Sequence, residues 1–150
     1  MSRLIYFLGG WMTLAVACAP AASPNEEAKP EASPDRIVAT HENGNPKQVY
    51  RYTGKDSLNR FETAYHPEGQ LLSEGQVING QRDGEWRSYH VNGQLWSLHH
   101  YTNGLQQGEY RVFYPDGTPR IEGRYINDNK SGEWIFFTEA GDTAKVVVFD

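Results

Sequence analysis

The sequence of residues 41–141 of this 150-residue chain repeats itself at a constant spacing, the 24 residues that separate Gly69 from Gly93. Three independent sets of residues keep that spacing: Gly69, Gly93, Gly117 and Gly141; Gly84, Gly108 and Gly132; and Asn79, Asn103 and Asn127. A degraded earlier copy fits at an offset of 49, which places His41, Gly44, Tyr52, Asn59 and Phe61 on His90, Gly93, Tyr101, Gly108 and Tyr110. Two full repeats would give an offset of 48 residues, and one extra residue within 62–65 explains the offset of 49. A period of about 24 residues predicts a stack of small units, each of which buries its apolar surface against its neighbours.

Each unit contains two turn signals. Pro67-Glu68-Gly69 and Pro115-Asp116-Gly117 have the chemistry of a type I turn that closes into a bulge, where glycine supplies a positive φ. The second signal is a longer loop that runs from Asn79-Gly80 to Gly84 and recurs one period later, with Asn59 in place of the last glycine in the first copy. Runs of about 6 to 9 residues rich in aromatic and β-branched side chains separate the turns, which is a strand length.

These patterns predict an all-β fold, a single-layer twisted antiparallel meander of about ten strands built from about 24-residue two-strand repeats. One large side chain per unit is needed to fill the buried face of such a sheet. We therefore assign two aromatic columns to the core: Phe61, Trp86, Tyr110 and Trp134, and Tyr52, Val77, Tyr101 and Tyr125.

The Gly-Glu-aromatic triplet recurs as Gly84-Glu85-Trp86, Gly108-Glu109-Tyr110 and Gly132-Glu133-Trp134, followed by Tyr89, Phe113 and Phe137. These residues resemble the MORN-repeat variant family, bacterial proteins whose units read aromatic-x-x-Asn-Gly-x-x-x-Gly-x-Trp-x-x-Tyr-x-x-(Asp/Asn)-Gly. The resemblance covers residues 41–141 and is specific for the repeat. Many such proteins carry the label of a YwqK-type antitoxin, which implies a role in binding and neutralising another protein.

The N-terminus has the features of an export signal. Arg3 precedes an apolar run over residues 4–17, which is a signal-peptide core and is short for a membrane span. Residues 14–18 (LAVAC) resemble the lipobox of bacterial lipoproteins, in which the leader is cut before the cysteine and the cysteine is acylated. We therefore predict a lipoprotein signal peptide over 1–17 and lipidation at Cys18. The alternative is ordinary cleavage after Ala17 with Cys18 incidental, and both readings export the protein.

Residues 18–36 form the acylated cysteine and a Pro/Ala-rich tether, ahead of a repeat domain over 37–150. Residues 19–36 hold four of the eight prolines and no aromatic or branched aliphatic residue, so nothing in them offsets the entropy of ordering. By resemblance to lipoproteins that lack Asp after the cysteine, Ala19 favours the outer membrane. We expect an outer-membrane lipoprotein of the bacterial cell envelope that faces the periplasm or the exterior.

Several functional classes are disfavoured. The 14 basic and 19 acidic residues give a net charge of -5, which argues against a nucleic-acid partner. The column of His41, His66 and His90 suggests a metal, but equivalent strands would lie about 9.6 Å apart, too far for a shared ion. Neither a nucleophile with a base nor a phosphate-binding loop is evident in the sequence. We predict no enzyme activity, no cofactor, no metal and no small-molecule substrate.

One repeat breaks the polar pattern of its own face. Trp96, Leu98 and His100 alternate along one strand and so face one way. Their equivalents are Leu72, Glu74 and Gln76 in the unit before, Arg120, Glu122 and Arg124 in the unit after, and Lys47, Val49 and Arg51 in the first unit. A Trp and a Leu beside Leu72, rimmed by charge, have the composition of a binding hot spot. Leu72, Trp96, Leu98 and His100 are therefore the predicted partner-binding site; the alternative is that the tail or the tether covers them.

The sequence as a whole favours a membrane-tethered, non-enzymatic module that binds an unidentified protein partner in the envelope and reaches the membrane through its lipid anchor. The first alternative is an antitoxin or immunity protein that neutralises a cognate toxin. The second is a repeat protein that binds lipid surfaces. The second is weakened by the mildly acidic repeat region, which has 11 Lys and Arg against 15 Asp and Glu.

Overall fold

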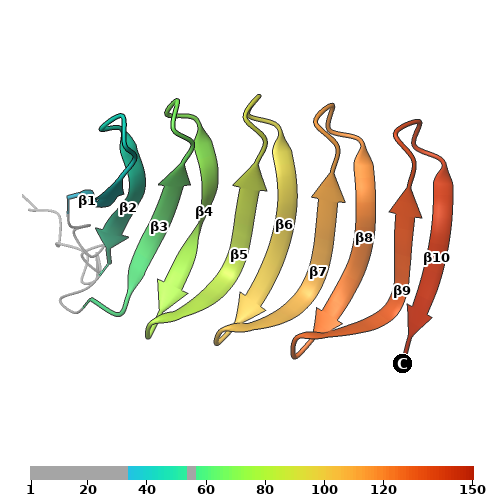
Figure 1. The fold of residues 1–150 in the computed structure, drawn as a ribbon. Coiled ribbons are helices and arrows are strands. Elements are labelled where there is room, and N and C mark those ends of the chain that lie inside the picture. Colours follow the sequence, from blue (N-terminus) through green and yellow to red (C-terminus); the bar gives the residue numbers. More distant parts are fainter. Residues whose placement is uncertain (1–33, 54–56) are drawn as a thin grey trace, which may run out of the picture.

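The computed structural model describes residues 34–53 and 57–150, and in this part of the chain it contains ten strands and no helix. The strands are β1 (Arg36–Thr40), β2 (Pro46–Tyr52), β3 (Arg60–Tyr65), β4 (Leu71–Ile78), β5 (Gln81–Tyr89), β6 (Leu95–Thr102), β7 (Leu105–Phe113), β8 (Pro119–Ile126), β9 (Asn129–Phe137) and β10 (Thr143–Phe149). They form one sheet in chain order, and every neighbouring pair is antiparallel (Figure 1). The predicted ten-stranded meander is confirmed.

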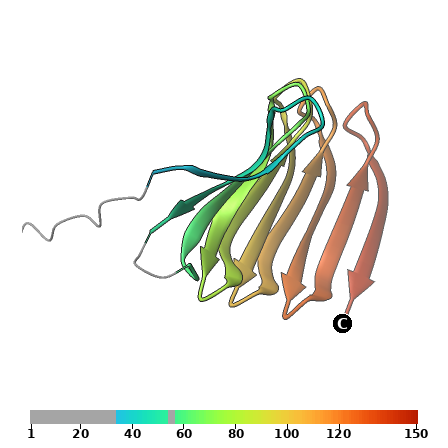
Figure 2. The same ribbon diagram turned by 60° about the vertical axis from the view of Figure 1, so that its left-hand side comes forward.

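The sheet is a single curved layer, and no other described element packs on either of its faces (Figure 2). The described residues include no helix that is long and apolar enough to cross a bilayer. The predicted signal peptide, Cys18 and residues 18–33 of the tether lie outside the described residues. The position of every site below therefore follows from the register of one sheet.

The turns that join each odd strand to the next even strand follow the prediction. Gly44, Gly69, Gly93, Gly117 and Gly141 have φ between +83 and +94°. In the second of these turns the Gly69 amide donates to the His66 carbonyl over 2.9 Å, and the His66 amide donates to the Gln70 carbonyl over 2.8 Å. This is the expected type I turn closed by a glycine bulge, and it occurs five times.

The opposite turns are tighter than predicted. Ile78 pairs with Gln81, so Asn79 and Gly80 alone form a two-residue turn, with φ of +51 and +78°. Positive φ at both positions gives a turn whose twist matches that of the strands it joins. Gly84, which we expected to end a longer loop, lies inside β5 at φ +73°, where the register shifts by a bulge. The spacing of the glycines was predicted correctly, but Gly84 forms a β-bulge and does not end a loop.

The first repeat was aligned wrongly by one residue. Glu62 pairs with Gly75, and Gly75 pairs with Trp86, so Glu62 occupies the position in β3 that Trp86 occupies in β5. Phe61 pairs with Gln76 and lies on the other face of the sheet, outside the column to which we assigned it. Glu62 and Trp86 are one regular period apart, so the extra residue lies before Glu62 and not within 62–65. Matching aromatic to aromatic caused the error, because a one-residue shift in a strand moves every side chain to the opposite face.

Asn59 also has a different role from the one expected, since it is not among the residues with positive φ. Its side-chain oxygen accepts a hydrogen bond from the Asn79 amide over 2.8 Å. Asp83 accepts from Asn103 and Gln107 accepts from Asn127 in the same way, over 3.1 and 3.0 Å. Asn59 is therefore the equivalent of Asp83. This column of acceptors joins each two-residue turn to the repeat before it.

The glycine-bulge turns, which lie at the top of the sheet in Figure 1 and which we call the upper turns, are joined by side chains that reach the next repeat. The ring Nε2 of His41 lies 2.9 Å from the Tyr65 carbonyl, and that of His90 lies 3.1 Å from the Phe113 carbonyl. The Tyr114 hydroxyl donates to the Phe137 carbonyl over 2.9 Å. At His41, His90 and Tyr114 this column thus joins successive repeats through backbone carbonyls, which explains why a tyrosine can replace a histidine in it, whereas the buried Nε2 of His66 makes no such bond.

The core lies on one face of the sheet, which we call the aromatic face and define by Trp86, His99, Tyr110 and Trp134. Trp86 and Trp134 are 6% and 2% exposed, and both were predicted to be core. Tyr52, Val77, Tyr101 and Tyr125, the second predicted column, share this face through the strand register.

The two tryptophans are buried without a second layer. A Cβ on Gly75 would overlap the Trp86 indole, and a Cβ on Gly123 would overlap that of Trp134, so each ring lies flat on a glycine. The Arg82 guanidinium lies 4.1 Å from the Trp86 ring and the Lys130 ammonium lies 4.4 Å from the Trp134 ring. Contacts of this kind between a cation and an aromatic ring shield the indoles from water where a second sheet would do so in a sandwich.

Candidate protein-binding surface

The other face of the sheet, which we call the polar face, is defined by Glu85, Arg87, Leu98, His100, Glu109 and Arg111. Leu98 on β6 pairs with Arg87 on β5 and with Arg111 on β7, so an arginine flanks it on each side. His100, two residues farther along β6, pairs with Glu85 on β5. This arrangement surrounds one aliphatic side chain with charge.

Trp96 lies two residues before Leu98 in β6, at the bulge between the Ser88–Ser97 and Tyr89–Leu95 pairs, and 44% of it is exposed. Ser97 between them points to the aromatic face and is 4% exposed, which leaves Trp96 and Leu98 on the other side. The Trp96 ring centroid lies 6.2 Å from that of His90. Trp96 is the only exposed tryptophan among the described residues.

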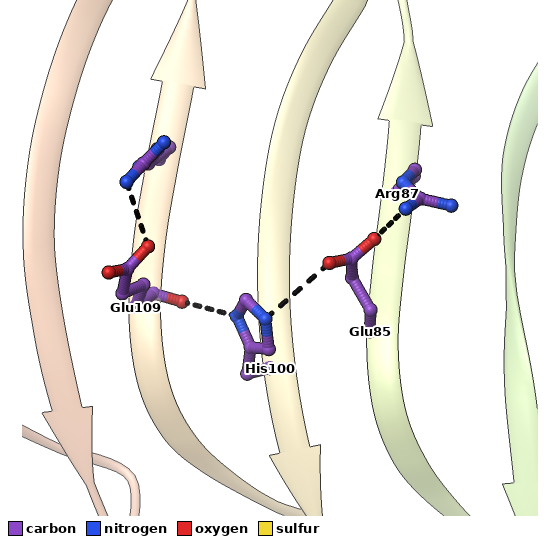
Figure 3. A network of polar contacts seen from close by, with 5 residues as sticks. Glu85, Arg87, His100 and Glu109 are labelled. Atoms are coloured by element: carbon purple, nitrogen blue, oxygen red, sulfur yellow. Dashed lines mark hydrogen bonds and ion pairs between the residues drawn. The ribbon is translucent and has the colours of Figure 1, made fainter.

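His100 lies between the two ion pairs that flank it (Figure 3). Its Nδ1 lies 3.1 Å from the Glu109 carbonyl, and because a carbonyl only accepts, Nδ1 is the donor. Its Nε2 lies 3.5 Å from a Glu85 carboxylate oxygen, and Glu85 in turn is paired with Arg87. The Arg111 guanidinium is 2.8 Å from the Glu109 carboxylate. Exposed pairs of this kind contribute little to stability, and their relevance here is that they place charges of both signs around Leu98.

Leu72 lies on the polar face of β4 but is not adjacent to Trp96, because β5 runs between their two strands. Tyr89 occupies that intervening strand on the same face, and its hydroxyl donates to the Glu74 carboxylate over 2.7 Å. Burial and then this carboxylate raise the pKa of Tyr89 to about 12, so the hydroxyl stays a donor well into the alkaline range. The structure thus brings Trp96, Leu98 and His100 together and places Tyr89 between them and Leu72.

Sequence reasoning missed Tyr89, Arg87 and Arg111 as members of this surface. A signal for the arginines was present, because Glu-aromatic-Arg occurs at residues 85–87 and again at 109–111. Residues two apart in a strand share a face, so this pattern places a glutamate and an arginine together beside β6 on both sides. In the next unit Ile135 replaces the arginine, and the pattern stops.

Farther along the sheet the polar face is charged and slightly hollowed. An open depression across β7, β8 and β9 is lined by Glu109, Arg111, Glu122, Arg124, Ser131, Glu133 and Ile135. Glu122 and Arg124 are the residues that replace Leu98 and His100 one repeat later. The apolar side chains of Trp96 and Leu98 and the charged residues around Glu122 are therefore neighbouring parts of one continuous surface.

The histidines considered for a metal lie elsewhere. His41, His66 and His90 occupy equivalent upper turns, and His41 and His90 point a ring nitrogen at a backbone carbonyl. His99 and His100 lie on opposite faces, as expected. In residues 34–53 and 57–150 no three His, Cys, Asp or Glu side chains are grouped closely enough to hold an ion.

Comparison with protein families gives a match to part of the chain. The model of the MORN repeat variant matches residues 82–103 and 106–127. The search of curated proteins finds no match. The two matched segments are offset by one period of the structure, and the first contains Trp96, Leu98 and His100. The centre of the sheet, from β5 to β8, is thus built from two adjacent repeats similar to the MORN repeat variant.

Proposed function

We propose that this protein is a non-enzymatic binding module that recognises a protein partner through the polar face around Trp96. The observation that carries the proposal is the placement of a 44% exposed tryptophan and of Leu98 between Arg87 and Arg111. Tryptophan and arginine are over-represented among the residues that dominate binding energy at protein interfaces. A single-layer repeat sheet supports this use, because it offers a long open surface of fixed curvature.

The charged groups on this surface also favour recognition over catalysis. Glu85, Arg87, Glu109 and Arg111 are paired with each other, and His100 is held between them. Together these groups present charges of both signs around an apolar centre, a pattern that a complementary protein surface can recognise. The depression farther along the polar face is open, whereas a small-molecule site usually encloses its ligand.

The sharpest test exchanges one repeat's surface for that of its neighbour. In the triple variant Trp96→Arg, Leu98→Glu, His100→Arg, the third unit carries the residues that the chain already tolerates at 120, 122 and 124. A photo-crosslinking amino acid at position 91, in the turn before β6, would report capture of the partner in the native envelope. We expect the triple variant to melt near the temperature of the parent and to lose the crosslinked product.

A matched pair of probes provides the control. The same photo-crosslinker placed at the equivalent position 139, in the turn two repeats farther along the sheet, should capture much less than at 91, and neither placement replaces Trp96. Equal capture at both positions, or a triple variant that still captures the partner, would show that Trp96 and Leu98 are not the contact.

The captured protein would also decide between the narrower functions. If it is a toxin whose activity falls when the purified domain is added, the protein is an antitoxin or immunity protein. If lipid is captured in place of protein, the surface binds membranes. The acidic balance of the repeat region favours a protein partner over anionic lipid.

We further propose that Cys18 anchors the module to the bacterial outer membrane, with residues 19–36 as the tether. The support is the coincidence of an apolar leader with the LAVAC motif at residues 14–18. Cys18→Ser should leave the precursor uncleaved or release the protein from the membrane fraction. A Cys18→Ser protein that is still acylated and membrane-bound would refute the anchor without affecting the proposed binding surface.

A further inference from the structure

The two outer strands of the described sheet differ in how well their free edges are protected. β1 has five residues, and its register against β2 shifts between Ile37 and Ala39 and again between Ala39 and Thr40. β10 has seven residues and pairs with β9 without interruption from Lys145 to Phe149. Short length and bulges are the usual means by which proteins prevent a sheet edge from pairing with another chain. β1 has both, and over Lys145–Phe149 β10 has neither.

The side chains of β10 add no protection either. Its sequence TAKVVVF contains no proline and one charged residue, Lys145. Val146 and Val148 are 49% and 68% exposed, and Val148 is the most exposed of the large hydrophobic side chains in the described residues. A regular, exposed and apolar edge is the kind that accepts a further strand.

Both faces of the sheet carry apolar side chains at this edge, beside Lys145 on the aromatic face and Glu133 on the polar face. On the aromatic face Val147 pairs with Trp134, and the Phe149 ring lies 6.1 Å from that of Trp134. On the polar face Val146 pairs with Ile135. A strand added outside β10 would therefore cover apolar surface on both faces while it satisfied the free backbone groups of β10.

We propose that the outer edge of β10 pairs antiparallel with β10 of a second copy of this chain, forming a two-fold dimer with a continuous sheet. The strand is complementary to itself: in a register centred on Val147, Val146 lies opposite Val148 and Lys145 lies opposite Phe149, each pair on one face. Lys145 would then meet an aromatic ring, as Lys130 meets Phe149 within the chain at 5.3 Å.

Pairing of β10 with β1 of another copy is disfavoured, because β1 has only five residues and two shifts of register. Such a contact would also repeat without end and form fibres, whereas the β10 contact closes after two copies. A two-fold axis perpendicular to the sheet keeps the polar faces of both copies on one side. Trp96 lies on β6, four strands from the dimer edge, so both Trp96 surfaces stay open and could bind a partner with two sites.

The test is disulfide trapping in the full chain, carrying Cys18→Ser so that one thiol is present. Directly opposed residues of an antiparallel pair lie close enough for a disulfide, so Val147→Cys should give a crosslinked dimer under mild oxidation. Val91→Cys is the matched control, because Val91 is 55% exposed but lies in the turn between β5 and β6. We expect crosslinked dimer from Val147→Cys and little from Val91→Cys.

Sedimentation of the same protein without an added cysteine gives the independent measurement. We expect a dimer that becomes a monomer in Val148→Lys, with an unchanged far-UV spectrum, and that persists in Val91→Lys. A monomeric parent protein, a dimer that survives Val148→Lys, or equal trapping at positions 91 and 147 would each overturn the proposal. None of these results would bear on capture at Trp96, because that surface is complete within one copy.

Discussion

The two faces of this sheet follow different rules although they are made by the same strands. On the aromatic face a change at one position is matched by a change at its neighbour. Trp86 packs on Gly75 and Trp134 packs on Gly123, whereas the smaller Tyr110 packs on the larger His99, with ring centroids 4.8 Å apart. On the polar face the equivalents of Leu98 are Val49, Glu74 and Glu122, and these partly exposed positions do not pack onto a neighbour as closely as the tryptophans do.

The difference shows where the repeat is constrained and where it is free. Close packing makes each buried residue depend on the volume of its neighbour, so substitutions on the aromatic face occur in pairs. Exposed positions on the polar face carry no such dependence, and a single repeat can acquire a tryptophan without loss of the fold. The freedom of the polar face is what allows one repeat to differ in function from the next.

The largest effect should come from Trp134→Ala. This ring is 2% exposed, so its removal should lower the free energy of unfolding by about 3–5 kcal/mol. Chemical denaturation measures the loss, and Trp96→Ala, which removes a tryptophan from the polar face, is the control and should cost less than about 1 kcal/mol. Similar losses for the two variants would erase the distinction between the faces.

The paired packing on the aromatic face predicts a compensating double variant. Gly75→His alone should overlap the Trp86 indole and destabilise the protein by about 1–3 kcal/mol. Adding Trp86→Tyr recreates the pair that His99 and Tyr110 form one repeat later. A double-mutant cycle should then give a coupling of about 1 kcal/mol or more in favour of the pair. Strict additivity would mean that the neighbours do not depend on each other's volume.

His99 should make the stability of the aromatic face depend on pH. Burial, and next the positive charge of Arg82, lower the pKa of His99 below its ordinary value of 6.5. Below pH 6.5 the unfolded chain therefore takes up a proton that the folded chain refuses, and the folded state loses stability until His99 itself is protonated.

The pH effect should be smaller than that of either packing change, because it involves one partly buried ring. His99→Phe keeps an aromatic side chain and should remove the corresponding part of the decline between about pH 7.5 and 5.5, followed by thermal melting. An unchanged decline in His99→Phe would assign the pH dependence to other groups.

The smallest effect is expected on the polar face. Glu109→Gln removes the charge that pairs with Arg111, and the two side chains are 52% and 44% exposed. The free energy of unfolding should change by about 0–1 kcal/mol, and raising the salt concentration should reduce even that difference. A loss of several kcal/mol would mean that the polar face is part of the structural core.

Much of the fold was predictable because it is encoded locally. The glycine and asparagine spacing located the turns, although it predicted a longer loop where Asn79-Gly80 forms a two-residue turn. The turns predicted the antiparallel meander, and the aromatic columns predicted Trp86 and Trp134 as core. The errors occurred where residue type was used in place of register: Phe61 was matched to Tyr110, and Asn59 to a glycine. Glu62 holds the aromatic position in β3 because Arg60 pairs with it at 2.7 Å, a substitution that hydrophobicity does not reveal.

The candidate site was predictable only in part. Alternation along one strand was sufficient to put Trp96, Leu98 and His100 on one side, since that periodicity is a property of the extended backbone. The arginines that flank Leu98 and the tyrosine between Trp96 and Leu72 come from other strands. Their positions depend on the stagger of each hairpin, including bulges that no single residue announces.

The sequence by itself determined the repeat, its turns, and the alternation that separates an aromatic from a polar side, because these depend on residues close together along the chain. The tertiary structure decided which side chains face each other across strands, how two tryptophans are buried in a sheet with one layer, and that β10 has an unguarded edge while β1 does not. Those features depend on the register between strands, and register is fixed by the packing of the whole sheet.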